Sequence, residues 1–179
     1  SSKSGVAHFV YDSEEECMNG IKRLLDFIPQ NNLENASKKD FTESNNSEEL
    51  RNIIPEKSTE PYDVKEVITR IVDNDDFLEV HANFAQNIVV GFGRIRGNSV
   101  GIVANQPASL AGMLDINASD KAARFVRFCD AYNIPVITFV DVPGFMPGVN
   151  QEHQGIIRHG AKLIYAYAEA TVPKISVIL

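Results

Sequence analysis

The chain has 179 residues, of which 44% are hydrophobic and 23% charged, so it is long enough and apolar enough to bury a core. The net charge of −7 argues against nucleic acid and anionic membranes as partners. No apolar stretch reaches the roughly 20 residues of a membrane-spanning helix. The cysteines, Cys17 and Cys129, form neither a C-x-x-C pair nor a zinc pattern, so we expect reduced thiols and a cytoplasmic protein.

The N-terminal third is expected to contain a strand, a helix and a linker. Residues 6–10 have the composition of a strand. Ser13, with Glu16 three residues later, forms the capping-box pattern that begins a helix, and Pro29 ends it. Residues 31–60 are rich in Asn, Ser, Glu and Lys, which is typical of a linker.

From Pro61 onward, helical and strand patterns alternate. Apolar spacing predicts a helix over 62–73, strands over 77–80, 88–96 and 100–104, a helix from Asn117, Ser119 or Asp120 to near Tyr132, a strand over 135–141, a helix over 154–170 and a strand over 174–179. A tight turn at Gly97-Asn98 joins two of these strands in a hairpin. The pattern predicts an α/β fold, a parallel sheet with right-handed crossover helices.

The last two elements carry a further expectation. The helix over 154–170 is apolar on several sides, so we expect it to be sandwiched between other elements. The strand over 174–179 has the composition of a buried strand. Together with the N-terminal sequence SSKSG, which is neither a signal peptide nor a natural start, this indicates a piece of a longer protein.

The loop over 141–148 is the most informative segment. It follows an apolar strand, contains Gly144 and Gly148, and has no His, Ser or Cys. Ligands of open α/β sheets bind at the carboxyl ends of the strands. Because glycine lacks a Cβ, backbone N–H groups can come close to a ligand there. We therefore expect chemistry at this loop to depend on amide donors rather than on a side-chain acid or base.

Other motifs leave alternatives open. The G-x-G-x-x-x-G run over 91–97 is followed by a hairpin, so close packing explains it better than dinucleotide binding. Glu152, His153 and His159 lack the spacing of metal ligands, and we expect no metal. The loop that begins at Asn105 either lines a pocket or packs as a connection, with equal weight.

Basic residues on two predicted helices have the same ambiguity. They either steer a phosphate or carboxylate or form solvated basic stripes. They are Arg158 and Lys162 on one helix, and Lys121, Arg124 and Arg127 on the other.

Six stretches carry a family resemblance. They are SGVAH at 4–8, NNL at 31–33, GIVANQP at 101–107, DKAARFVRFCD at 120–130, VDVPGF at 140–145 and GIIRHGAK at 155–162. Together they resemble the carboxyltransferase (β) subunit of biotin-dependent acyl-CoA carboxylases, propionyl-CoA carboxylase being the closest type. The resemblance runs nearly end to end and weakens only near 34–58.

The resemblance implies a crotonase-like (ClpP/crotonase) architecture. Residues 1–30 would be the end of an N-terminal carboxyltransferase domain, 31–60 the linker, and 61–179 the first part of a C-terminal carboxyltransferase domain. It also implies a hexamer for the full-length protein, and the cytoplasm or, in a eukaryote, the mitochondrial matrix as its location. The family's remaining oxyanion donors lie outside these residues, so this chain alone is expected to be inactive.

The implied reaction moves a carboxyl group from carboxybiotin to the α carbon of an acyl-CoA such as propionyl-CoA. Backbone amides hold the oxyanions of the enolate and of the ureido group. Biotin would arrive on a separate carrier protein or domain, in complex with a biotin carboxylase subunit, because the chain has no A-M-K-M attachment motif. By analogy, the amide donors for biotin are Gly144, Phe145 and Met146, and the candidate substrate-binding residues are Asn105, Gln106, Pro107, Pro143 and Gly148.

Two alternatives remain. The α subunit of methylmalonyl-CoA decarboxylase and the large transcarboxylase subunit resemble this chain too, and a decarboxylase runs the same half-reaction backwards. A non-catalytic piece that contributes only oligomer contacts is the alternative from another functional class.

Overall fold

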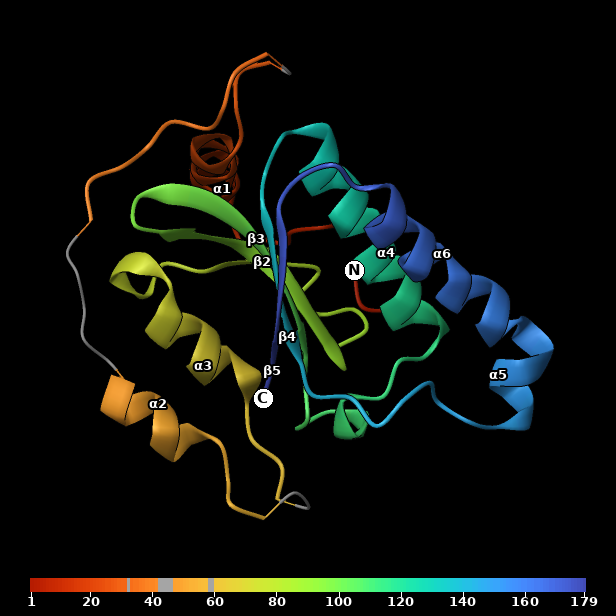
Figure 1. Cartoon of the computed structure of the whole chain (residues 1–179). Coiled ribbons are helices and arrows are strands. Elements are labelled where there is room, and N and C mark those ends of the chain that lie inside the picture. Colours follow the sequence, from red (N-terminus) through yellow and green to blue (C-terminus); the bar gives the residue numbers. More distant parts are fainter. Residues whose placement is uncertain (32, 42–46, 58–59) are drawn as a thin grey trace.

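One mixed sheet forms the centre of the computed structural model, which describes residues 1–31, 33–41, 47–57 and 60–179. Within them, five strands lie in the order β1-β2-β3-β4-β5 (Figure 1). The strands are β1 (Leu78–Val80), β2 (Ile88–Ile95), β3 (Asn98–Asn105), β4 (Val136–Val140) and β5 (Lys174–Ile178). The β3-β4 and β4-β5 pairs are parallel, and the β1-β2 and β2-β3 pairs are antiparallel. The α/β class is confirmed, and the predicted hairpin makes the sheet mixed rather than wholly parallel.

Helices cover both faces of the sheet. The α-helices are α1 (Glu14–Phe27), α2 (Ser47–Ile53), α3 (Val64–Ile71), α4 (Ile116–Ala131), α5 (Val149–Gln154) and α6 (Ile156–Glu169). Short 3-10 turns, η1 (Asp73–Asp75) and η2 (Leu110–Gly112), follow α3 and β3. Figure 1 shows α4 and α6 together on one side of the sheet and α3 on the other. The expected linker 31–60 contains α2, and its residues 32, 42–46 and 58–59 lie outside the described part.

Two hydrophobic clusters, one on each face, hold these layers together. Val90 and Phe92 of β2 pack toward α4, against Phe125 and others. Val89, the intervening residue, packs with Ile68 of α3. Because successive side chains of a strand alternate between faces, a strand buried on both faces has to be apolar throughout. This explains the uninterrupted apolar runs of β2 and β3.

Local capping signals are found where the first two long helices begin. The Ser13 hydroxyl accepts a hydrogen bond from the Glu16 amide at 3.2 Å, and the Glu16 carboxylate accepts one from the Asp12 amide at 3.2 Å. The predicted capping box is therefore present. Helix α4 begins earlier than predicted, because Asp115 is its cap and accepts from the Ala118 amide at 2.8 Å.

The structure differs from the predicted elements in three places. Residues 6–10 form no strand, and the segment is tied to the sheet region by the His81 amide donating to the His8 carbonyl at 2.9 Å. Gly155, with φ of 87°, ends α5 and separates it from α6, so the predicted helix is broken near its start. The outer face of α6 is exposed rather than sandwiched (Ile157 and Ile164), and so is the whole of β5.

Glycines of β2 permit close packing, as predicted for the run over 91–97. A Cβ on Gly91 would lie 2.5 Å from the Leu78 carbonyl oxygen, and one on Gly93 would lie 2.5 Å from a methyl carbon of Val72. No side chain fits at either position without displacing its neighbours. The antiparallel pairing of β2 with β3 confirms the hairpin, and its turn is Arg96-Gly97 rather than the predicted Gly97-Asn98, because Asn98 already pairs with Ile95.

Gly101 of β3 offers a stability test of the contact between the sheet and α4. A Cβ at this position would overlap the Cys129 Sγ and press on the Phe125 ring. We expect Gly101→Ala to lower the free energy of unfolding by about 1–3 kcal/mol, the usual cost of overpacking. In urea denaturation, adding Cys129→Ala should recover part of this loss, because it removes the overlapping sulfur. Strictly additive effects of the two changes would contradict this packing.

Candidate functional site

Two loops meet at the carboxyl ends of β3 and β4. The Leu114 amide donates to the Gly144 carbonyl at 3.1 Å, and the Met146 amide donates to the Leu114 carbonyl at 2.9 Å. These bonds form a parallel bridge between Leu114 and Phe145. The loop 141–148 is thus attached to the loop after η2.

This bridge decides which amides of the loop are available. The Met146 amide is used within the fold, which removes one of the three predicted donors from consideration. Successive peptide groups of an extended chain point to opposite sides, so the Phe145 amide faces away from Leu114. Among the described residues, the Gly144 and Phe145 amides have no hydrogen-bond partner. The Phe145 N–H group can therefore be donated to a ligand on the side away from Leu114, and the Gly144 N–H group is also unpartnered but belongs to the preceding peptide group, which points elsewhere.

The surroundings of these amides are open. Gly144 and Gly148 have φ of 146° and 133°, and a Cβ on either would meet nothing within 4 Å. Pro143 and Gly148 are exposed. The Phe145 side chain, 47% exposed, lies on Gly160 of α6, where a Cβ would come within 2.6 Å of its ring. The loop therefore exposes bare backbone beside an anchored aromatic ring.

Side chains at the start of the loop hold it in place. The Tyr62 hydroxyl donates to the Asp141 carboxylate at 2.8 Å, and the Asp141 amide donates to Asn105 Oδ1 at 3.3 Å. Burial and the adjacent carboxylate raise the pKa of the Tyr62 phenol well above its ordinary value. The phenol consequently keeps its proton at any pH at which the protein is assayed.

The predicted substrate-binding residues on β3 are used for packing. Asn105 Nδ2 donates to the Gly112 carbonyl at 3.2 Å, and Gln106 Nε2 donates to Asp63 at 2.6 Å. Both side chains are buried, and Pro107 next to them is half-buried. Of the two interpretations of this loop, the structure supports the packed connection, so these side chains position the glycine loop.

Sequence reasoning missed the partners of the loop that come from far along the chain. Tyr62 lies 79 positions from Asp141, and no local pattern connects the two. Gly160 lies in the stretch 155–162 that carries the family resemblance. The sequence did not indicate that this glycine leaves room for the Phe145 ring, which lies on it in the fold.

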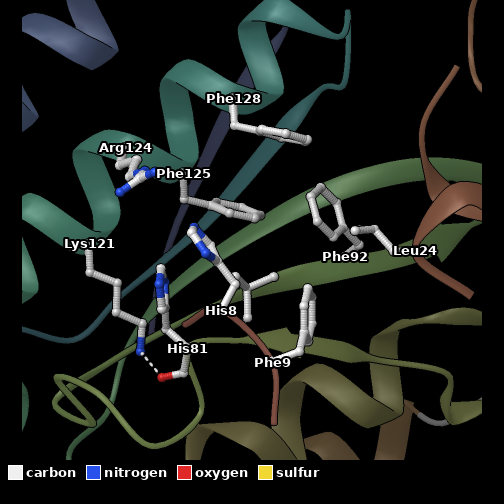
Figure 2. Close-up of a pocket in the computed structure, with 10 residues that line it drawn as sticks. His8, Phe9, Leu24, His81, Phe92, Lys121, Arg124, Phe125 and Phe128 are labelled. Carbon is white, nitrogen blue, oxygen red and sulfur yellow. Dashed lines mark hydrogen bonds between the residues drawn. The ribbon is translucent and has the colours of Figure 1, made fainter. Parts of the chain in front are cut away.

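A second feature, a cavity of about 430 Å³, lies between α4, α1, the sheet and the segment around His8 (Figure 2). Figure 2 shows Phe125 and Phe128 projecting from α4, and the imidazole rings of His8 and His81 next to each other. Their ring centroids are 4.0 Å apart. No local sequence pattern indicated this cavity, because its walls come from separate segments.

Lys121 is buried beside this cavity and does not belong to a basic stripe. Its ammonium group donates to four backbone carbonyls, those of His81 (3.1 Å), Phe84 (2.7 Å), Ala85 (3.3 Å) and Ile88 (2.8 Å). Burial lowers the pKa of Lys121 to about 8, so the ammonium form prevails at pH 7. Lys121 therefore fastens the 81–88 segment to α4.

His81 is buried in a neutral form. Its side chain is 6% exposed, and its Nε2 has no hydrogen-bond partner among the described residues. Burial, followed by the neighbouring His8 and Lys121, lowers the pKa of His81 to about 4. Burial also lowers the pKa of His8, with a further contribution from Arg124.

These shifts predict acid sensitivity. The pKa of His81 is lowered in the folded state, so the unfolded chain binds its proton first, and stability is lost as the pH falls from about 6.5 to 4. We expect this group to contribute about 1–3 kcal/mol of that loss. His81→Asn, which tolerates the local φ of 56°, should flatten this part of the dependence in urea unfolding at several pH values. An unchanged slope in the variant would contradict it.

The remaining basic residues separate into paired and exposed ones. Asp120 accepts from Lys162 at 2.9 Å and contacts His159 Nδ1 at 2.8 Å. Arg124, Arg127 and Arg158 are exposed. In the described part of the chain, no cluster of three or more His, Cys, Asp or Glu could hold a metal ion. No helix there is long and apolar enough to span a membrane.

Comparison with known proteins gives one family. The sequence model of one protein family, the carboxyl transferase domain, matches residues 1–179 of this chain. The methylmalonyl-CoA decarboxylase subunit alpha of Veillonella parvula is 56% identical over 99% of this chain and 35% of its own length. The propionyl-CoA carboxylase carboxyltransferase subunit of Haloferax mediterranei is 54% identical, with the same coverage of 99% and 35%.

A solved structure agrees with these relatives. The transcarboxylase 12S crystal structure, described as a hexamer with hydrolysed methylmalonyl-coenzyme A bound, superposes with a TM-score of 0.95 at 55% identity. It is matched over 99% of this chain and 35% of that chain. The chain thus spans about a third of the length of the curated relatives that it matches.

Proposed function

The chain belongs to the carboxyl transferase domain family, and we propose that it contributes to a site that moves a carboxyl group between biotin and an acyl-CoA. The observation that carries this proposal is the pair of unpartnered amides at Gly144 and Phe145, at the carboxyl end of β4. A backbone N–H donor that is left unpaired by the fold is the kind of group that stabilises a developing oxyanion, and the Phe145 amide, which faces away from Leu114, is the one we assign to it.

The loop fits a biotin ureido ring. Carboxybiotin, when bound, would supply the carboxyl group as carbon dioxide, and the ureido anion left behind, whose charge is shared with the ureido oxygen, would take the α proton of the acyl-CoA. The open space beside Gly144 and Gly148 leaves room for a flat ring to approach the backbone. The exposed Phe145 ring offers an apolar surface beside it. No side-chain acid or base of the loop is required.

The residues of this chain have separable roles in the proposal. The Phe145 amide would donate to the ureido oxygen, and Gly144, Pro143 and Gly148 would border its approach. The side chains of Asn105 and Tyr62 form hydrogen bonds with Asp141 and so fix the start of the loop. The bridge between Leu114 and Phe145 orients the peptide groups of the loop. Loss of one such donor typically costs about 10²–10³-fold in rate.

The direction and the substrate are part of the proposal. We propose carboxylation of the α carbon of a short acyl-CoA such as propionyl-CoA, with biotin delivered by a separate carrier. The intact protein would be a homo-oligomer, a hexamer in our proposal. A decarboxylase role is the second candidate, because a relative with that name is 56% identical. The free thiols of Cys17 and Cys129 suit a reducing compartment such as the cytoplasm or mitochondrial matrix.

A transfer assay tests this function. The intact protein is incubated with methylmalonyl-CoA and free biotin, and propionyl-CoA formation is followed by chromatography. We expect biotin-dependent turnover, with malonyl-CoA and ethylmalonyl-CoA, the carboxylated forms of acetyl-CoA and butyryl-CoA, compared to define chain length. The absence of turnover with every carboxylated acyl-CoA, in an intact and assembled protein, would favour the non-catalytic alternative.

A further inference from the structure

The cavity between α4 and the His8 segment has no role in the proposed carboxyl transfer. We propose that it binds a small aromatic acid that carries a hydroxyl group. Its ring would pack among phenylalanines, its hydroxyl would form a hydrogen bond with His81 Nε2, and its carboxylate would meet Arg124. Each part rests on a different group of the cavity.

The size and the walls of the cavity suit a small aromatic molecule. Its volume of about 430 Å³ falls within the range of pockets that bind small ligands. Its apolar walls include Phe9, Phe92, Phe125 and Phe128 (Figure 2). Aromatic rings pack favourably edge-to-face or offset against one another, so a planar ligand ring has partners on several sides.

His81 supplies a specific polar contact. Its imidazole is buried and lines the cavity, and Nε2 has no partner among the described residues. A neutral imidazole carries its proton on one ring nitrogen and accepts at the other. A ligand hydroxyl, which can both donate and accept, therefore complements Nε2 in either tautomer.

Arg124 supplies the charge. It lines the cavity from α4 and lies close enough to both histidines to lower the pKa of each. Among the described residues it makes no hydrogen bond or ion pair, and no Asp or Glu lines the cavity. Lys121 cannot take this role, because backbone carbonyls already accept its protons. The cavity therefore favours an anion at the Arg124 end.

Three probes separate these contacts in the intact protein. 4-Hydroxybenzoate carries the ring, hydroxyl and carboxylate, benzoate lacks the hydroxyl, and phenol lacks the carboxylate. Calorimetry measures affinity, and NMR shift changes locate binding. We expect 4-hydroxybenzoate to bind about tenfold more tightly than phenol, since a hydrogen bond to a charged group is typically worth at least that factor, and about three- to tenfold more tightly than benzoate, which lacks only a hydrogen bond to the neutral His81. Shift changes should centre on His8, His81 and Phe125.

Matched variants assign each contact. Arg124→Gln should weaken 4-hydroxybenzoate about tenfold and leave phenol unchanged. Arg127→Gln, exposed on the same helix but outside the cavity, is the control and should change neither. His81→Asn should weaken both hydroxyl-bearing probes and leave benzoate unchanged.

Three results would overturn the proposal. They are no saturable binding of 4-hydroxybenzoate, shift changes remote from the cavity, or equal effects of Arg124→Gln and Arg127→Gln. If His81→Asn does not fold, the proposal is still tested by comparing Arg124→Gln with Arg127→Gln and by comparing the affinities of the three probes.

Discussion

Phe145→Pro is expected to reduce the rate of carboxyl transfer by about 10²–10³-fold, whereas Phe145→Leu keeps most of it. Proline removes the backbone N–H that we propose as an oxyanion donor, and leucine retains it. Both variants lose the aromatic ring that lies on Gly160, so the difference between them reports the amide alone. The comparison is made on kcat of the intact protein with free biotin.

The fold should tolerate this proline. The hydrogen bonds that attach the loop use the amides of Leu114 and Met146 and not that of Phe145. Phe145 is also absent from the residues with positive φ, and Gly144 before it is conformationally permissive. Urea unfolding should therefore give similar stabilities for the two variants. Equal activities in two equally stable variants would show that the Phe145 amide is not a donor.

Lys121→Met is expected to produce the largest loss of stability, about 3–5 kcal/mol in the free energy of unfolding. The Lys121 side chain is 3% exposed, and its ammonium group is shared by four carbonyls of the 81–88 segment. Methionine fills a similar volume but leaves those carbonyls without a donor. A buried polar group that loses its partner costs far more than an exposed one.

Lys65→Met is the matched control for this substitution. Lys65 forms an ion pair with Glu79 at 2.8 Å, but its side chain is 39% exposed. Solvent screens such pairs, so the expected loss is about 0–1 kcal/mol. Chemical denaturation of both variants checks the difference. Similar losses in the two would mean that the four carbonyls find other donors when Lys121 is replaced.

Local features of the sequence were sufficient for much of the fold. The capping box at Ser13 and the hairpin between β2 and β3 were predicted because each depends on residues next to one another, although the turn lies at Arg96-Gly97, one residue before the predicted Gly97-Asn98. The prediction of a strand over 6–10 was wrong, because the composition of a segment does not show whether another strand is available to pair with it. Helix α4 begins before the predicted starts at Asn117, Ser119 or Asp120, because the Asp115 side chain caps it.

The sequence by itself determined that a glycine loop without catalytic side chains follows an apolar strand, because loop composition and strand periodicity are local properties. The tertiary structure alone decided which amides of that loop are free, since Leu114, on a separate loop, takes the Met146 amide and leaves that of Phe145. The tertiary structure also decided that two basic residues of helix α4 differ in burial, since Lys121 is buried and Arg124 is exposed. Hydrogen-bond availability and burial depend on groups from other segments, and no short-range pattern specifies them.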